Sequence, residues 1–194
     1  MHIILCDKID SGKSAFLVEL LHRLDAAKEA ASGWATPAFI EGGEKRGHDF
    51  VAIENGQIKK RIPFTRMHPF PSSASFSYLA GDSPEAAAFR ACPYHFNSEV
   101  FERAEGIAEK AAFPEGKRSV FIIDEIGPLE LFAQSGFYLA AHKAFEKAPK
   151  TVTVVRKGLE EDLRRAFPLL SFTVSGLADK AGIAQALALP LPDL

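Results

Sequence analysis

Short apolar runs divide the chain and predict its buried strands. The runs at 2–6 and 119–123 are almost wholly apolar and too short for typical helices, which indicates strands covered on both faces. Two later segments, 151–155 and 170–174, are also expected to be strands. The first run leads directly into the polar stretch Asp7-Lys8-Ile9-Asp10-Ser11-Gly12, which predicts a turn at the end of the first strand.

Between these runs, apolar residues recur every three or four positions, as in amphipathic helices. In the first such segment Leu17, Leu20, Leu21 and Leu24 form one stripe that can pack against a sheet. Helices are expected from Lys13 onward, from Asn97 or Ser98 to about 112, and over 137–147, 159–167 and 178–189. Strands alternating with helices favour an α/β fold, with a mostly parallel sheet and helices on both faces.

Residues 33–63 break this alternation. Two turn signals, Gly42-Gly43 and Asn55-Gly56, separate short β-like runs. Such dipeptides favour tight hairpins because they tolerate positive φ. This segment therefore predicts an antiparallel meander inserted into the α/β fold.

Residues 63–91 combine Pro, Ser and Gly with five aromatic side chains: Phe64, Phe70, Phe76, Tyr78 and Phe89. Loops of this length are uncommon in compact domains unless they act as lids or are disordered. We expect a long surface excursion. It is either a lid or a mobile insertion that merely covers the core.

Composition bounds the class of protein. The chain has 194 residues, of which 47% are hydrophobic, enough for one compact core, so a single domain over 1–194 is expected. The formal net charge of −2 offers no basic footprint, and nucleic acid is not an expected partner. With only Cys6 and Cys92, no disulfide framework is indicated, which fits a reducing compartment.

The apolar start of the chain is interrupted at Asp7 and Lys8, too early for a signal-peptide core. No apolar stretch approaches the length needed to cross a bilayer. We therefore expect a cytoplasmic protein without a membrane partner. The pattern predicts no particular oligomeric state.

The turn after the first strand carries the strongest chemical signal, Ser11-Gly12-Lys13-Ser14. A phosphate-binding loop needs converging backbone amides, a lysine for the outer phosphates and a hydroxyl on Mg²⁺, all at a helix N-terminus. Gly12 permits close approach of the backbone, Lys13 reaches the β and γ phosphates, and Ser14 ligates the metal. The expected nucleotide-binding residues are Lys8, Ile9, Asp10, Ser11, Gly12, Lys13, Ser14 and Ala15.

The loop departs from the full Walker A pattern G-x-x-x-x-G-K-[ST] at its first position, where Asp7 replaces glycine. Asp tolerates unusual backbone angles better than most residues, so the loop can still form. However, Asp7 and Asp10 put two carboxylates near the phosphates, where their charge opposes binding. Lys8 offsets part of this charge.

A second signal is the acidic pair Asp124-Glu125 at the end of the apolar run 119–123. A carboxylate at this place can hold the metal through water, as P-loop enzymes require of their Walker B acid. Glu125 can orient or deprotonate the attacking water. Acidic residues at strand ends are often only solvated loop residues, and it is the combination with Lys13 and Ser14 that favours a catalytic role.

The segment 124–131, Asp-Glu-Ile-Gly-Pro-Leu-Glu-Leu, resembles the signature of the THEP-type nucleoside triphosphatases, a family formerly grouped with nucleotide kinases. Further similarity lies in Gly42-Gly43 to Gly47, in Pro93-Tyr94-His95-Phe96 and in Val154-Val155-Arg156-Lys157. The resemblance spans most of the chain. The segment 63–91 is longer than the usual connection in that family.

The resemblance implies a P-loop fold that hydrolyses nucleoside triphosphates, with broad base tolerance and Mg²⁺ as cofactor. Carried over residue by residue, Gly12, Lys13 and Ser14 match the phosphate loop. Asp124 matches the metal-coordinating acid, Glu125 the catalytic base, and Glu130 the further acid of the family's signature.

Arg156 follows a strand expected to neighbour that of Asp124, so its guanidinium is a candidate for stabilising charge on the γ-phosphate. A surface ion pair is the alternative. His95 has no metal-ligating neighbours at suitable spacing and is better explained as a core or edge histidine. For Arg46 and Arg66, phosphate contacts from a lid compete with roles as solvated loop charges.

The leading hypothesis is an Mg²⁺-dependent nucleoside triphosphatase that cleaves the β–γ phosphoanhydride bond of ATP or GTP, with Glu125, Lys13 and Arg156 as catalytic residues and Ser14 and Asp124 on the metal. One alternative is a phosphotransferase, whose acceptor the aromatic excursion would cover. The other is a regulatory module that binds nucleotide without hydrolysing it, because Asp7 and Asp10 crowd the loop. The preferred base is not predicted.

Overall fold

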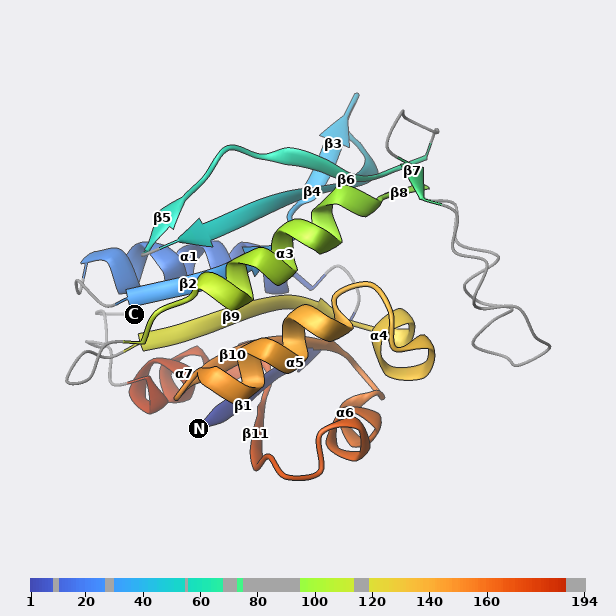
Figure 1. The fold of residues 1–194 in the computed structure, drawn as a ribbon. Coiled ribbons are helices and arrows are strands. Elements are labelled where there is room, and N and C mark those ends of the chain that lie inside the picture. The colour runs from blue at the N-terminus through green and yellow to red at the C-terminus, as the bar shows by residue number, and fades with distance from the viewer. Residues whose placement is uncertain are drawn as a thin grey trace.

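A mixed sheet forms the centre of the molecule in the computed structural model, which describes residues 1–8, 11–26, 30–54, 56–67, 73–74, 95–113 and 119–187 (Figure 1). The strands in the described ranges are β1 (His2–Asp7), β2 (Ala30–Ala35), β3 (Ala38–Glu41), β4 (Glu44–Glu54), β5 (Gln57–Ile58), β6 (Ile62–Arg66), β7 (Ser73–Ala74), β8 (His95–Asn97), β9 (Ser119–Ile126), β10 (Thr151–Arg156) and β11 (Phe172–Ser175). Their order is β11-β1-β10-β9-β2-β4-β6-β8-β7, with β3 and β5 both paired to β4.

The first five strands of this order, β11, β1, β10, β9 and β2, run parallel to one another. Their carboxyl ends therefore meet at one edge of the sheet, where ligands of open α/β sheets bind. Strand β10 separates β1, which precedes the phosphate loop, from β9, which carries the acidic pair. The predicted parallel sheet is confirmed, and Arg156 at the end of β10 neighbours the acid strand as expected.

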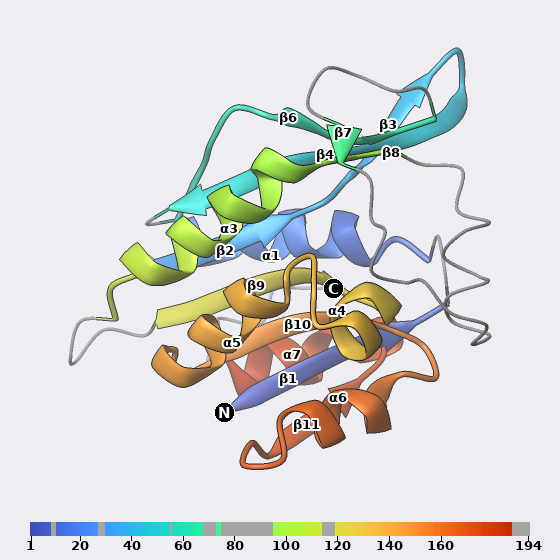
Figure 2. The ribbon, with the colours of Figure 1, turned by 45° about the vertical axis from the view of Figure 1, so that its right-hand side comes forward.

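Helices cover both faces of the sheet, as predicted (Figure 2). They are α1 (Lys13–Ala26), α3 (Ser98–Lys110), α4 (Pro128–Ala133), α5 (Tyr138–Lys147), α6 (Glu160–Ala166) and α7 (Lys180–Ala186), with a short 3-10 helix at Leu177–Asp179. Helices α1 and α7 pack with residues of β1, β9 and β10 in one core cluster, and α3, α5 and α6 contribute to a second cluster on the opposite face.

The leucine stripe predicted for α1 is buried. Leu17, Leu20, Leu21 and Leu24 are each at most 2% exposed. Burying such a side chain contributes roughly 1.5–3 kcal/mol relative to leaving it in water. The stripe thereby fixes the helix whose first turn carries Lys13 and Ser14.

The predicted antiparallel meander is also confirmed. Glu41 pairs with Glu44 across a two-residue turn formed by Gly42 and Gly43, whose φ values are +60° and +82°. A second hairpin joins β4 to β5, and its Gly56 has φ +78°. Asn55 lies outside the described residues.

Several boundaries differ from the expectation. Residues 63–66 of the expected excursion belong to strand β6, and Phe64 is a core residue, because its ring packs against Phe96, Phe101 and Phe137. Most of the remainder of 63–91 lies outside the described residues. The expected last helix is shorter, since α7 ends at Ala186 and residues from 188 onward are not described.

Strand β2 and helix α4 were not predicted. Strand β2, Ala-Ala-Ser-Gly-Trp-Ala, is built largely from small residues and lacks an apolar run. At Gly33, with φ +128°, a Cβ would collide with the Ile122 carbonyl of the neighbouring strand, so close contact with β9 requires glycine. Helix α4 has only 6 residues, too few for a periodic pattern.

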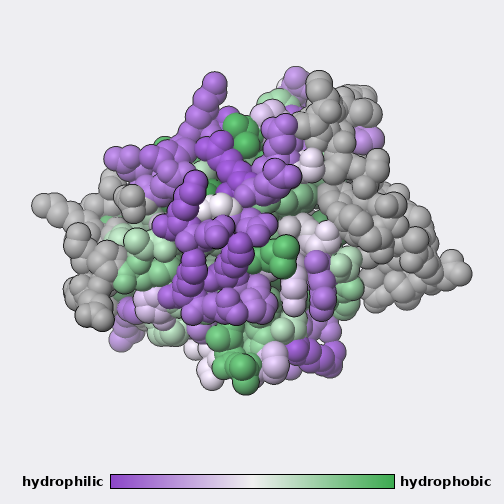
Figure 3. All heavy atoms as spheres, viewed as in Figure 1, coloured by the Kyte–Doolittle hydropathy of each residue, from purple (hydrophilic) through white to green (hydrophobic). Residues whose placement is uncertain are grey.

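The face that carries α3 and α5 is largely hydrophilic (Figure 3). Lys143 of α5 bridges the helices, with its Nζ 2.8 Å from Glu105 and 3.5 Å from Glu109 of α3. Among the described residues, no helix is both long and apolar enough to cross a bilayer.

Candidate active site

The predicted phosphate loop joins the end of β1 to the start of α1. Its described part is held by a hydrogen bond of 3.3 Å from the Ser11 amide to the Lys8 carbonyl. Gly12 has φ +93°, a conformation that L side chains rarely adopt, although no atom of the described residues would lie within 4 Å of a Cβ there. Glycine is needed here for its backbone and not for space. Ile9 and Asp10 lie outside the described residues.

The first turn of α1 carries Lys13 and Ser14, and its backbone amides have no partner within the helix itself. It contains no acidic side chain that would compete with an anion for these amides. The positive end of the helix dipole adds to the attraction. Ala15 is exposed in the same turn.

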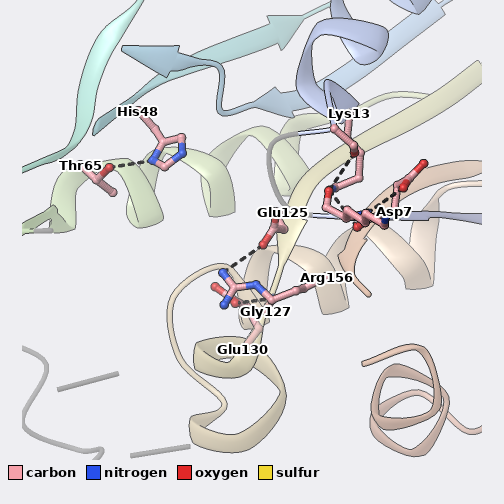
Figure 4. A network of polar contacts seen from close by, with 10 residues as sticks. Asp7, Lys13, His48, Thr65, Glu125, Gly127, Glu130 and Arg156 are labelled. Carbon is pink, nitrogen blue, oxygen red and sulfur yellow. Dashed lines mark hydrogen bonds and ion pairs between the residues drawn. The ribbon is translucent and has the colours of Figure 1, made fainter. Parts of the chain in front are cut away.

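Lys13 is only 6% exposed and is turned back onto the loop (Figure 4). Its Nζ donates to the carbonyls of Asp7 at 3.1 Å and Lys8 at 2.6 Å, and lies 3.5 Å from the Ser11 hydroxyl. An ammonium group has three N–H donors. To contact a phosphate, Lys13 must exchange at least one of these partners, and the long Ser11 contact is the weakest.

Asp7 occupies the position of the missing glycine, and its Oδ1 accepts a hydrogen bond of 2.7 Å from the Lys8 amide. That amide is one of the donors expected to face the phosphates, so the Asp7 carboxylate occupies a donor that a phosphate would otherwise use. In the register of β1 and β10, Asp7 is paired with Arg156. The carboxylate of Asp7 therefore comes from a strand position next to that of the cationic residue Arg156.

Asp124 lies near the end of β9 and is 1% exposed. Its Oδ2 accepts a hydrogen bond of 2.8 Å from the amide of Thr36, and the hydroxyls of Ser14 and Thr36 also donate to the carboxylate. Burial raises the pKa of the Asp124 carboxyl to about 6, and the hydrogen bonds from Thr36 and Ser14 oppose this rise. The sequence-predicted Ser14 and Asp124 are thus brought into contact.

Glu125, the next residue of β9, is half-buried and points toward Arg156 (Figure 4). Nη2 of Arg156 lies 3.3 Å from Oε1 of Glu125. The Arg156 side chain is 47% exposed and that of Glu125 is 32% exposed, so both reach water at the mouth of the site. The structure therefore brings together Glu125 and Arg156, two of the predicted catalytic residues.

Glu130, the last acid of the signature, is buried in α4, where its carboxylate links two backbone segments. Oε2 accepts from the Gly127 amide at 2.9 Å, and Oε1 accepts from the Phe137 amide at 3.1 Å. Burial raises the pKa of Glu130 to about 7, and the amides of Phe137 and Gly127 oppose this rise. A Cβ at Gly136 would collide with Glu130, so the surrounding loop is fitted to this side chain.

The donor set near Asp124 fits a magnesium ion. Ser14 and Asp124 supply hard oxygen ligands, the type that Mg²⁺ prefers, and Mg²⁺ is commonly held by one or two protein groups together with phosphates and water. Within the described part of the chain, no three His, Cys, Asp or Glu side chains cluster as a metal cage. This combination suits an ion that arrives with a nucleotide.

The other candidates from the sequence lie on β4, β6 and β8, in the antiparallel part of the sheet. His95 of β8 is the register partner of Arg66 in β6. The Arg66 guanidinium lies 2.6 Å from Asp49 and stacks 3.9 Å from the Phe39 ring centroid. Arg46 forms an ion pair of 2.7 Å with Glu44. Both arginines therefore have protein partners within the meander.

Thr36 is a residue near the site that the sequence did not single out. It follows β2, a strand without a periodic signal, and precedes Pro37. The only available hint was the Thr-Pro pair, since a residue before proline favours extended backbone, which suits a strand end.

Comparison with known proteins supports these assignments of fold and class. The profile of the family described as NTPase matches residues 2–175. A human cancer-related nucleoside triphosphatase, determined in solution, is 21% identical, with 95% of this chain and 97% of that chain covered and a TM-score of 0.64. THEP1 from the hyperthermophile Aquifex aeolicus is 21% identical, with 96% of each chain covered and a TM-score of 0.57. No curated protein sequence gives a significant match.

The two structural likenesses establish the P-loop NTPase fold, and the family profile includes both the loop that ends in Lys13-Ser14 and the pair Asp124-Glu125. The chain therefore belongs to the NTPase family and is a nucleoside triphosphatase of the THEP type.

Proposed function

We propose that the protein cleaves the β–γ phosphoanhydride bond of ATP- or GTP-type nucleotides in a reaction that depends on Mg²⁺. The observation that carries this proposal is the buried Asp124 carboxylate, 1% exposed, with the Ser14 side chain among the groups that lower its pKa. Ser14 lies in α1, which follows β1, and Asp124 lies in β9. In the sheet, β10 separates these two strands. The proximity of Ser14 to Asp124 supports one site shared by a phosphate loop and a metal-binding acid.

The triphosphate lies across the loop from Lys8 to Ala15. Backbone amides of the loop and of the first turn of α1 donate to phosphate oxygens, and the positive φ of Gly12 lets the chain turn toward them. Lys13 gives up its contact with Ser11 and neutralises the outer phosphates, while its bonds to loop carbonyls keep the ammonium in place.

Ser14, through its hydroxyl oxygen, and Asp124, through its carboxylate, would hold Mg²⁺. When bound, the ion neutralises charge on the β and γ phosphates. Asp124 is nearly inaccessible to bulk water, and the Thr36 amide is one of the protein donors that hold its carboxylate.

Glu125 orients the attacking water and accepts its proton, and Arg156 places its guanidinium near the charge that develops on the γ-phosphate. Both side chains are partly exposed, which leaves them room to turn toward a ligand. If Arg156 turns from Glu125 toward the phosphate, the carboxylate becomes free to act as a base.

Release of free phosphate tests the proposal. Wild-type protein is incubated with ATP, GTP, CTP and UTP, with and without Mg²⁺ and without any acceptor, and both affinity and phosphate release are measured. We expect phosphate release that requires Mg²⁺. Nucleotide binding with no release in any condition would contradict hydrolysis.

The same panel addresses the two alternatives. A phosphotransferase would release phosphate only slowly without an acceptor. The aromatic lid that favoured a phosphotransferase lacks Phe64, because this residue lies in the core. A regulatory module would bind nucleotide without turnover. The hydrogen bond from the Lys8 amide to Asp7 favours this alternative, because it occupies a donor that is expected to face the phosphates.

A further inference from the structure

Thr36 reaches the proposed metal-binding acid from a third segment of the chain. Strand β2 pairs in parallel with β9, and the register Trp34 to Ile123 brings the end of β2 next to Asp124. Thr36 follows directly after this strand and is only 7% exposed. The topology thus carries Thr36 to the same sheet edge as the phosphate loop.

Two donors of Thr36 act on the same carboxylate. The amide lies 2.8 Å from Oδ2 of Asp124, and the hydroxyl forms a further hydrogen bond to it. Rotation of an aspartate carboxyl about its last bond is only weakly restricted by intrinsic preference. Two donors on one neighbouring residue therefore restrict the carboxylate orientation, and Ser14 adds a donor from the α1 side.

We propose that Thr36 is a positioning residue that holds the Asp124 carboxylate in the orientation required for Mg²⁺ and the nucleotide. This inference rests on the proposed function of Asp124. It assigns Thr36 no contact with substrate. Its contribution is to reduce the reorientation that Asp124 would otherwise undergo when the metal arrives.

The backbone around Thr36 is itself anchored to the meander. The Pro37 carbonyl accepts a hydrogen bond of 2.9 Å from the Asp49 amide, and the Asp49 carboxylate forms the 2.6 Å ion pair with Arg66. Proline restricts the local backbone further, because its φ is fixed by the ring. This anchoring gives the meander a role at the site, since it keeps Thr36 in place beside β9.

The test compares Thr36→Val with Thr36→Ser. Valine has a similar shape but lacks the hydroxyl, whereas serine keeps it, and both retain the backbone amide. Thr65→Val is the matched control, because Thr65 of β6 is also buried but hydrogen bonds to His48 at 2.9 Å. For each protein, the Kd of ATP is measured with Mg²⁺ and with a chelator, alongside kcat and the melting temperature.

The quantity of interest is the factor by which Mg²⁺ tightens ATP binding. Thr36→Val should reduce this factor roughly tenfold, in line with the loss of a hydrogen bond to a charged group, while metal-free binding changes less than about twofold. Thr36→Ser should restore the factor to within about threefold of wild type, and Thr65→Val should leave it unchanged.

An unchanged Mg²⁺ factor in Thr36→Val, with only a lower melting temperature, would overturn the positioning role and leave a purely structural one. Failure of Thr36→Ser to restore the factor would overturn it as well. If Mg²⁺ does not tighten ATP binding to wild-type protein, the proposed function fails. If Mg²⁺ tightens binding equally in wild type and in Thr36→Val, only the positioning role fails.

Discussion

Nη2 of Arg156 lies 3.3 Å from Oε1 of Glu125, so the cation that we assign to the γ-phosphate contacts the carboxylate that we assign to the attacking water. The contact joins the ends of neighbouring strands β10 and β9. It also explains how both interpretations of Arg156 apply, because a partly exposed ion pair can occupy a catalytic position. The roles of the two residues can be separated by substitution.

Replacing Glu125 with glutamine should abolish most phosphate release while retaining nucleotide. The amide has nearly the same size as the carboxylate but cannot accept a proton, and the loss of a general base typically costs 10²–10⁴-fold in rate. Phosphate release and ATP affinity are measured on the same preparation. Glu54→Gln, on an exposed residue of the meander, serves as the control. Unchanged release would reject Glu125 as the base.

Replacing Arg156 with alanine should lower kcat by roughly 10²–10³-fold, because a donor aimed at developing charge is lost. Stability should hardly change, since exposed ion pairs contribute about 0–1 kcal/mol. Arg165→Ala removes a comparable exposed pair, 2.9 Å from Asp162, and should leave kcat unchanged. If both variants kept full activity, Arg156 would be only a surface ion-pair partner.

Replacing Lys13 with alanine should remove measurable nucleotide binding. The variant loses the ammonium that faces the phosphates, and the remaining loop amides would have to hold the triphosphate with little positive charge nearby. The carbonyls of Asp7 and Lys8 also lose their donor. Titration with ATP and Mg²⁺ checks the result, with Lys180→Ala as the control, because Lys180 lies beside α1 but contacts Glu19 and Phe16. Retained binding in Lys13→Ala would contradict the assignment of the loop.

Restoring glycine at the first loop position, by Asp7→Gly, should strengthen nucleotide binding. The change removes a negative charge near the phosphates and frees the Lys8 amide from its 2.7 Å hydrogen bond. We expect a decrease in Kd of roughly tenfold at low ionic strength, and a smaller effect in high salt.

Asp7→Asn separates charge from backbone freedom, because it removes the charge but keeps a side chain that can accept from the Lys8 amide. If charge dominates, Asn should reproduce most of the gain. Weaker binding in both variants would instead mean that Asp7 supports the loop.

Much of this fold could be predicted from local pattern. The buried strands β1 and β9, the leucine stripe of α1 and the Gly42-Gly43 turn each result from a local preference that agrees with the final packing. Strand β2 was missed for a physical reason. Gly33 is required because β9 approaches closely there, and that requirement exists only once the sheet has formed.

Part of the candidate site could be proposed from the sequence in the same way. Lys13, Ser14 and Asp124 belong to motifs that are contiguous in sequence, so a role can be proposed for each of them without the structure. Thr36 belongs to no motif. Its role depends on the parallel pairing of β2 with β9 and on the fixed backbone at Pro37, which are properties of the assembled sheet.

The buried carboxyl of Glu130 predicts a specific pH dependence of stability. Burial raises the pKa of Glu130 from 4.5 to about 7. Between these two pH values the folded protein holds a proton on Glu130 that the unfolded chain has already released. The free energy of unfolding therefore falls as pH rises through this window, by an amount on the order of 2–3 kcal/mol.

Glu130→Gln removes this titration. Glutamine offers one acceptor and one N–H₂ group to two backbone donors, the amides of Gly127 and Phe137, so the variant loses one hydrogen bond at every pH. Because the variant cannot titrate at this position, its melting temperature should also depend less steeply on pH than that of wild type. The melting temperature of wild type minus that of the variant should be higher at pH 5 than at pH 8, by roughly 5–10 °C. Glu54→Gln, on an exposed acid, should run parallel to wild type, and a Glu130→Gln curve parallel to both would show that Glu130 does not titrate in this range.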